Sequence, residues 1–268
     1  MPSKATHTAT NYRLIDSHCH LDMDCFTNDR HGVLLAAQQV NISDIILPAI
    51  SASRWPLMQQ IQSDNRSTVQ LHNAYGLHPM FMSQHQQADL DTLADWLEHK
   101  NPIAVGECGL DFFIKEAQPQ DQLAFFEAQV KLSCEFDLPL IIHSRKSLDL
   151  VLKILRQYPC SRGVVHCFSG SEQQAWQLIN LGFYVSFGGV ITYPRAKKLR
   201  HLVSQLPLEH LLLETDSPDQ PDYQHYGLRN EPAWLVNIAA TFAELRHDSL
   251  ENIARISRLN TKTLFALS

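Results

Sequence analysis

Two histidines one residue apart, His18 and His20, follow a short apolar run and a carboxylate near the start of the chain. In an extended segment alternate side chains share a face, so these imidazoles point the same way while Cys19 points the other way. Imidazole nitrogens are common ligands of zinc and other divalent metals. The pair alone fits two surface histidines equally well, so its meaning depends on whether later segments supply more ligands.

Four later apolar segments also end in a residue that can bind a metal. These residues are Glu107, His143, His166 and Asp216. With the histidine pair they make four imidazoles and two carboxylates, enough for two divalent ions, and a carboxylate such as Glu107 can bridge ions about 3.5–4 Å apart. Each side chain taken singly also fits an ordinary hydrogen-bonded residue. Their joint occurrence at five strand ends predicts a two-metal centre.

The elements that must position these ligands are eight short apolar segments, which we predict to be strands. They are Leu14–Asp16, Asp44–Ala49, Leu71–Gly76, Ile103–Glu107, Leu140–His143, Gly163–His166, Tyr184–Phe187 and Leu211–Glu214. Most lack clean alternation, as expected of parallel strands that are buried on both faces. Helical patterns lie between them, and two more helices, near Pro232–Arg246 and Ser249–Ala266, follow the last strand.

This order of elements predicts an α/β fold, a (β/α)8 TIM barrel, with a doubly wound open sheet as the alternative. In a barrel all strands end at one face, so residues spread over two hundred positions become neighbours there. The chain has 268 residues, of which 44% are hydrophobic and 19% charged. These values predict a single barrel domain over residues 12–268, preceded by a polar extension, 1–11, that we expect to be disordered.

Composition also limits the location and the partners of the protein. The first residues lack the apolar core of a signal peptide, and no segment approaches the length of a membrane span, so we expect a cytoplasmic protein without a membrane partner. The six cysteines include no Cys-x-x-Cys pair and are interpreted as free thiols of a reducing cytosol. A net charge of −6 argues against a broad basic face that coats nucleic acid, although an enzyme can still hold one strand end.

An ordered series of short motifs resembles the TatD family of metal-dependent hydrolases and deoxyribonucleases, within the amidohydrolase-like barrels. The motifs are Asp16-Ser17-His18-Cys19-His20-Leu21-Asp22, Gly76-Leu77-His78-Pro79, Val105-Gly106-Glu107-Cys108-Gly109-Leu110-Asp111, Leu140-Ile141-Ile142-His143-Ser144-Arg145, His166-Cys167-Phe168-Ser169-Gly170 and Leu213-Glu214-Thr215-Asp216-Ser217-Pro218. Two further segments, Ile191-Thr192-Tyr193-Pro194-Arg195-Ala196 and Pro218-Asp219-x-Pro221, are most similar to the YjjV branch. The resemblance extends from about Arg13 to the C-terminus.

The resemblance implies a barrel with two divalent metal ions. By the family pattern His18, His20 and Asp216 hold one ion, His143 and His166 hold the other, and Glu107 bridges them. Four imidazoles favour zinc or manganese on ligand softness, whereas the family is often associated with magnesium-dependent nuclease activity, so the ion stays open among these three. Cys108 stands where the family usually has an apolar residue. By alternation along the strand its side chain faces away from Glu107.

Two further residues are candidates for substrate binding. Arg145 lies two residues beyond His143 and can either clamp a phosphate or form an ion pair with Glu214. His78 can donate to a phosphate or a leaving oxygen, or simply cap a loop. Asp216 is the expected base, which orients a metal-activated water and accepts its proton, and Glu107 is the second catalytic carboxylate.

We therefore expect a metal-dependent hydrolase of phosphate esters, namely a deoxyribonuclease that removes nucleotides from the 3′ end of single-stranded DNA. One alternative is hydrolysis of carbon–nitrogen or carboxylic ester bonds, in the manner of an amidohydrolase or a deacylase. Another is a metal-binding barrel without turnover, which ranks last because every expected ligand is present. The sequence does not determine the natural substrate, the active metal or the oligomeric state.

Overall fold

The structure is a computed structural model that describes residues 12–114 and 118–268. The extension predicted for residues 1–11 lies outside these ranges. The strands are β1 (Leu14–Asp16), β2 (Ile42–Pro48), β3 (Gln70–Ala74), β4 (Val105–Asp111), β5 (Leu140–Arg145), β6 (Gly163–Val165), β7 (Tyr184–Phe187) and β8 (Leu211–Leu213). The α-helices are α1 (Arg30–Gln39), α2 (Trp55–Asp64), α3 (Gln87–His99), α4 (Pro119–Glu135), α5 (Leu148–Leu155), α6 (Glu172–Asn180), α7 (Lys197–Gln205), α8 (Leu235–Arg246) and α9 (Leu250–Phe265).

The strands are all parallel and close into a barrel. Hydrogen-bonded ladders join β1 to β3 in order, and β4 to β8 in order. Short bridges complete the circle, with Tyr75 beside Val105 after β3, and Cys19 beside Ser217 between the ends of β1 and β8. The (β/α)8 barrel is thus confirmed, and these bridges exclude the open doubly wound sheet.

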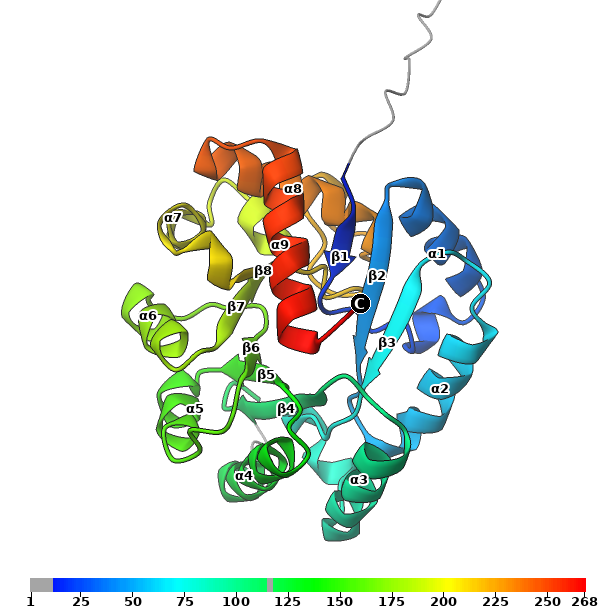
Figure 1. The fold of residues 1–268 in the computed structure, drawn as a ribbon, viewed down its shortest axis with the longest axis vertical. Coiled ribbons are helices and arrows are strands. Elements are labelled where there is room, and N and C mark those ends of the chain that lie inside the picture. The colour runs from blue at the N-terminus through cyan, green and yellow to red at the C-terminus, as the bar shows by residue number, and fades with distance from the viewer. Residues whose placement is uncertain (1–11, 115–117) are drawn as a thin grey trace, which may run out of the picture.

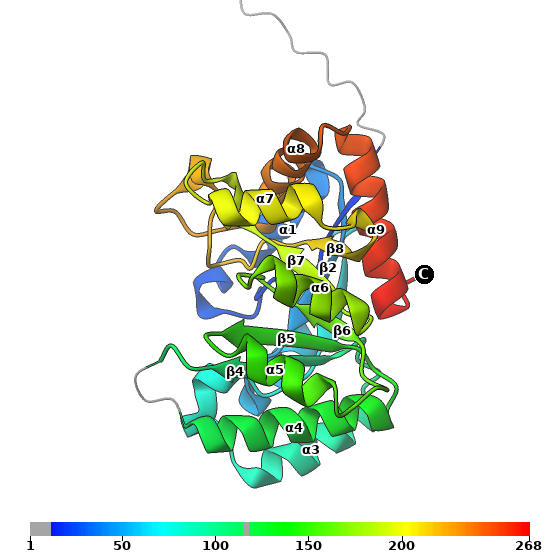
Figure 2. The same cartoon turned by 90° about the vertical axis from the view of Figure 1, so that its left-hand side faces the viewer.

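Helix α9 covers the amino-terminal end of the barrel. Leu264 and Phe265, near its carboxyl end, pack with the barrel-facing residues of six strands. The amide of Asn260 donates to the carbonyls of Leu208 and Leu211 at 2.8 and 2.9 Å, which fixes α9 beside β8. Figure 1 shows α9 in red in front of the barrel. In Figure 2 it lies on the side of the barrel opposite the arrowhead of β5, which marks the carboxyl end of that strand. The other end, where the strands finish, stays open for a site.

The strand interiors explain why this sequence forms a barrel. Six strands are buried along nearly their whole length, whereas β3 is exposed at its first residue and β5 becomes exposed toward its carboxyl end. The apolar residues of the strands face either the barrel interior or the surrounding helices. Because both faces of these strands are buried, their sequences lack the alternation of apolar and polar residues that is typical of a strand with one exposed face. Within the described residues, no helix is long and apolar enough to cross a membrane.

The interpretation of all six cysteines as free thiols is wrong for two of them. Cys134 near the end of α4 and Cys160 before β6 form a disulfide, with Cα atoms 5.6 Å apart. Neighbouring parallel strands begin side by side, and the amide of Leu140 donates to the carbonyl of Arg162 there, so the segments that lead into β5 and β6 meet. The remaining cysteines, Cys19, Cys25, Cys108 and Cys167, are free.

Candidate metal centre

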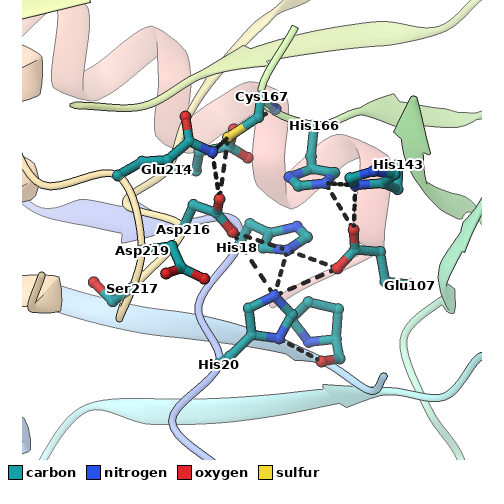
Figure 3. A network of polar contacts seen from close by, with 12 residues as sticks. His18, His20, Glu107, His143, His166, Cys167, Glu214, Asp216, Ser217 and Asp219 are labelled. Atoms are coloured by element: carbon teal, nitrogen blue, oxygen red, sulfur yellow. Dashed lines mark hydrogen bonds and ion pairs between the residues drawn. The ribbon is translucent and has the colours of Figure 1, made fainter. Parts of the chain in front are cut away.

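The six predicted metal ligands lie together at the carboxyl ends of the strands. His18 and His20 follow β1, Glu107 lies in β4 and His143 in β5, and His166 and Asp216 follow β6 and β8. All of them are buried or nearly so, and all but the fully covered His18 line a pocket of about 620 Å³. Figure 3 shows their side chains pointing toward one another. Barrel geometry alone accounts for this meeting, because every strand ends at this face.

The first group of ligand atoms surrounds one carboxylate oxygen. Nε2 of His18 lies 3.1 Å from Nε2 of His20, and the two nitrogens lie 3.1 and 3.4 Å from Oε2 of Glu107. Oδ1 of Asp216 lies 3.6 and 3.7 Å from the same two nitrogens. Two imidazoles and two carboxylates therefore converge on a common point, as a divalent cation requires.

The second group surrounds the other oxygen of the same carboxylate. Oε1 of Glu107 lies 2.7 Å from Nε2 of His166 and 3.2 Å from Nδ1 of His143, and these two nitrogens are 3.3 Å apart. The ring of His18 stacks on that of His166 with centroids 3.9 Å apart, so the two groups are immediate neighbours. Glu107 presents one oxygen to each group.

Hydrogen bonds behind two imidazoles fit this site to a metal. Nδ1 of His20 lies 3.2 Å from the carbonyl of Pro48, and Nε2 of His143 lies 2.9 Å from Oδ2 of Asp111. Both partners are acceptors, so each ring carries its proton there and turns the lone pair of its other nitrogen toward Glu107. Electron-rich atoms face each other in both groups, and a cation between them removes their repulsion. The residues present therefore fit a pair of divalent ions.

Protons supply positive charge to these groups when no metal is bound. Burial opposes a charge on His166, but the charge of Glu107 outweighs it and raises the pKa of His166 to about 10. Burial likewise opposes a charge on His20, and hydrogen bonding and charge from Glu107 raise its pKa to about 9. Burial disfavours ionised Glu107 as well, yet the imidazoles around it, His166 first, hold its pKa well below the usual range. The centre is thus an ionised carboxylate surrounded by groups that carry or attract positive charge.

Asp216 is held in place by residues that the sequence analysis did not single out. Its backbone has φ of +59°, and its Oδ2 accepts a hydrogen bond of 2.6 Å from the amide of Gln220. The thiol of Cys167 lies 3.5 Å from the same oxygen. Burial raises the pKa of Asp216, but the charges of His166 and His18 outweigh it and bring the pKa below the ordinary value. Asp216 is ionised, with Oδ1 directed at the first group.

His78 reaches the centre with both ring nitrogens engaged. Its Nδ1 accepts from the backbone amide of Met80, and its Nε2 lies 2.9 Å from Oε1 of Glu107. Burial is the main cause that lowers its pKa to about 4, so the ring is neutral. His78 therefore caps the turn that begins at Pro79, as one alternative held, and it also supports Glu107.

Arg145 lines the same pocket but does not contact Glu214. The guanidinium lies over the ring of Phe113, 3.6 Å from its centroid, and the side chain is exposed. The oxygens of Glu214 instead accept from the amide of Cys167 and the hydroxyl of Ser186, both at 2.6 Å. The alternative of an Arg145–Glu214 ion pair is therefore wrong, because β5 carries Arg145 beyond the buried carboxylate to the rim.

Two aspartates near the ligands have different tasks. Asp111, whose role was not predicted from the sequence, is fully buried and orients His143 from behind. Its spacing from Glu107, four residues along the same strand, is the signal that was available. Asp16 binds the amide and hydroxyl of Thr215 at 2.9 and 2.6 Å, so it joins the ends of β1 and β8 and contacts no ligand imidazole.

The sequence and the fold of this chain are similar to those of known metal-dependent hydrolases. Residues 15–266 match the family described as TatD related DNase. The chain is 39% identical to an uncharacterized metal-dependent hydrolase, YjjV, of Escherichia coli over 94% of this chain and 98% of that protein. It is 35% identical to an uncharacterized metal-dependent hydrolase of Haemophilus influenzae, with the same coverage of both chains. The crystal structure of YjjV superposes with a TM-score of 0.90, and covers 96% of this chain and 99% of that one, at 38% identity.

Proposed function

This chain belongs to the TatD family of metal-dependent hydrolases, and from that membership and its strand-end site we propose that it hydrolyses phosphate esters, as a deoxyribonuclease acting at 3′ ends. The observation that carries the proposal is the position of Glu107, with one oxygen directed at each of two groups of imidazoles. His18, His20 and Asp216 would hold one ion, His143 and His166 the other, and Glu107 both.

Bound divalent ions supply two chemical effects, a lower pKa for a water and polarisation of a phosphoryl oxygen. The chain supplies the positioning. Asp216 orients the attacking water and accepts its proton through Oδ1, because Gln220 already occupies Oδ2. Glu107, supported by His78, fixes the separation of the two groups.

Arg145 supports a phosphate as the substrate group. Its guanidinium forms no carboxylate ion pair among the described residues, lines the pocket of the metal ligands and is steadied by Phe113. A guanidinium can donate two parallel hydrogen bonds to a phosphate, which a carbonyl substrate would not require. The position of the Arg145 guanidinium in this pocket therefore favours phosphate esters over amides and carboxylic esters as substrates.

The test begins by removing metals with a chelator and restoring magnesium, manganese or zinc one at a time. The substrates are 5′-labelled single-stranded DNA and bis(4-nitrophenyl) phosphate. Stepwise shortening of the DNA from its 3′ end supports the nuclease. Cleavage of the small diester with intact DNA would reject nucleic acid as the substrate and keep the phosphodiesterase, and failure on both would reject phosphate esters and turn the search to esters and amides.

Removal of the Asp216 carboxylate is the matching mutational prediction. We expect Asp216→Asn and Asp216→Ala to lower kcat by about 100-fold or more, the range that a lost general base costs. Asparagine is the cleaner replacement, because the positive φ of this residue is tolerated by asparagine and costs alanine stability. Turnover retained by a folded Asp216→Asn protein, checked by circular dichroism, would remove Asp216 from the mechanism.

A further inference from the structure

A second pocket adjoins the metal centre and takes no part in the mechanism above. It has a volume of about 760 Å³, within the range of sites for small organic ligands. Two of its wall residues, Asp219 and Gln220, also line the pocket of the metal ligands, so the two pockets are adjacent. In Figure 2 the orange segment after β8 lies on the same side of the molecule as the arrowhead of β5, the side at which the strands end.

The walls of this pocket include parts of the two segments that resemble the YjjV branch. One wall comes from the segment after β7, with residues 190, 193 and 195–199, and the other from the segment after β8, with residues 218–221 and 226–228. The hydroxyl of Tyr193 donates to the carbonyl of Pro221 at 3.0 Å, and the amide of Tyr223 donates to Thr192 at 2.7 Å. A Cβ on Gly189 would lie 2.2 Å from the carbonyl of Gln220, so only glycine permits this approach. The pocket is therefore preformed.

Two tyrosines, Tyr193 and Tyr226, line this pocket, and the ring of a third, Tyr223, lies against that of Tyr193. Tyr226 is 74% exposed and Tyr223 is 58% exposed. Their rings stand edge-on to that of Tyr193, with centroids 6.3 and 5.5 Å away. Exposed tyrosine rings held by one another present flat faces to solvent, as platforms for stacked bases do.

Cationic side chains lie beside these rings. Arg195, Lys197 and Lys198 line the pocket and are exposed, and the guanidinium of Arg195 lies 5.4 Å from the centroid of Tyr193. The lysine and arginine ion pairs of the described residues include none of these three. Among the described residues that line the pocket, the only carboxylate is that of Asp219. In a chain of net charge −6, this wall is locally positive.

We propose that this pocket, the Tyr226 pocket, binds the single DNA strand on the 5′ side of the scissile phosphate. Bases stack on Tyr226 and Tyr193, and the phosphates between them contact Arg195, Lys197 and Lys198. The combination of aromatic faces with a cationic wall is how proteins hold single strands without reading sequence. An enzyme that removes the 3′ nucleotide has one nucleotide beyond the scissile phosphate, so a pocket farther from the reacting atoms holds the 5′ side. The inference rests on the proposed nuclease function.

A binding experiment tests the pocket apart from catalysis. The full chain is kept in chelator to stop turnover, and anisotropy reports the binding of 5′-fluorescein hexathymidylate. We expect Tyr226→Ala to weaken binding about tenfold, the loss typical of one stacked base. Lys197→Ala should reduce the slope of log affinity against log salt by about 0.7. Leu259→Ala and Lys100→Ala, exposed positions outside the pocket, serve as controls.

The ligand class is tested with an abasic strand of the same length and charge. Weaker binding of the abasic strand by the wild type, with the difference lost in Tyr226→Ala, supports stacking. Equal binding of both strands, or equal binding by Tyr226→Ala and Leu259→Ala, would overturn the proposal. Both control positions carry a large exposed side chain, so a general effect of truncation would appear in them too.

Kinetics then separate this proposal from the proposed function. We expect the ratio of kcat/KM for hexathymidylate to that for dithymidylate to fall about tenfold in Tyr226→Ala and to stay at the wild-type value in the controls. A wild type that cleaves bis(4-nitrophenyl) phosphate and both oligonucleotides with a ratio insensitive to Tyr226 would overturn the pocket and keep the nuclease. If the wild type cleaves neither DNA nor the diester, the proposed nuclease function is rejected. The binding of the strand in chelator would then decide whether the Tyr226 pocket binds single-stranded DNA.

Discussion

A carboxylate behind a metal-binding histidine decides which ring nitrogen faces the metal. Asp111 accepts from Nε2 of His143 at 2.9 Å, and it also accepts from the amide of Phe113 at 2.8 Å, which fixes its own orientation. Burial raises the pKa of Asp111, but these hydrogen bonds outweigh it and keep the carboxylate ionised. The imidazole therefore has one tautomer available, and its lone pair points at Glu107.

Replacement of this carboxylate should weaken the centre without removing a ligand. We expect Asp111→Asn to lower metal affinity by about 10- to 100-fold, as for other residues that support a ligand histidine. Competition with a chromogenic chelator measures the affinity for zinc. Asp91→Asn, an exposed position on α3, removes the same charge far from the centre and should bind zinc like the wild type. Equal affinity of the Asp111→Asn protein would show that Asp111 does not position His143.

At the scale of single elements, the short strands depend on side chains that join them. Asp16 ties β1 to the residues after β8, and Asp44 in β2 accepts from Nε2 of His72 in β3 at 2.8 Å. Burial raises the pKa of Asp44, but the hydrogen bond from His72 and the charges of His72 and Lys262 bring it below the ordinary value. Such a group stabilises the fold only while it is ionised.

The Asp44 pair predicts a pH-dependent contribution to stability. We expect Asp44→Asn to lose about 1 kcal/mol of unfolding free energy near neutral pH, the typical value of one hydrogen bond. Because the folded-state pKa is depressed, the difference from wild type is complete above about pH 4, the ordinary value. It then disappears as the pH falls through the lower folded-state pKa. Urea unfolding at several pH values measures it, and a difference that does not change with pH would contradict this account.

The disulfide between Cys134 and Cys160 joins the end of α4 to the segment that leads into β6. It spans a sequence separation of 26 residues, a loop for which chain entropy predicts about 3.5 kcal/mol of stabilisation. We expect Cys134→Ser to lower stability by that order in oxidised protein and to have no effect under reducing conditions. Cys25→Ser, at an exposed free cysteine, is the control. Six reactive thiols in unfolded, unreduced protein would exclude the disulfide.

At the scale of the whole molecule, the centre joins both ladders of the barrel. His18 and His20 extend from the three-stranded ladder, and Glu107, His143 and His166 come from the five-stranded one. Metal that binds the folded state alone adds to the free energy of unfolding in proportion to the logarithm of its concentration over Kd. Ions held across this seam therefore stabilise the closed barrel.

Metal removal should consequently lower the melting temperature. Metal at about 100 times its Kd contributes about 2.7 kcal/mol. For a chain somewhat above 150–250 residues this corresponds to roughly 5–10 °C in Tm. Calorimetry with and without chelator measures the shift, which we expect to be much smaller in Glu107→Gln. An equal shift in that variant would mean that the stabilising metal binds elsewhere.

The sequence by itself determined the number and order of the strands, and the residue types at their ends. All eight predicted strands overlap the observed ones, because runs of buried apolar residues are a local property of the chain. Barrel topology then required the strand-end residues to meet, so the six proposed ligands could be named before any coordinates. The ligands hardly depend on the exact bounds of β6 or β8, since His166 and Asp216 lie just beyond them.

Only the tertiary structure decided what each of these side chains contacts. Whether Arg145 could form an ion pair with Glu214 depended on how far β5 runs past the buried carboxylate. The Cys134–Cys160 disulfide and the Asp111–His143 hydrogen bond join segments 26 and 32 positions apart, and no local pattern encodes such pairs. Distances between strands are set by packing of the whole barrel, because side-chain direction and reach depend on neighbours that sequence spacing does not reveal.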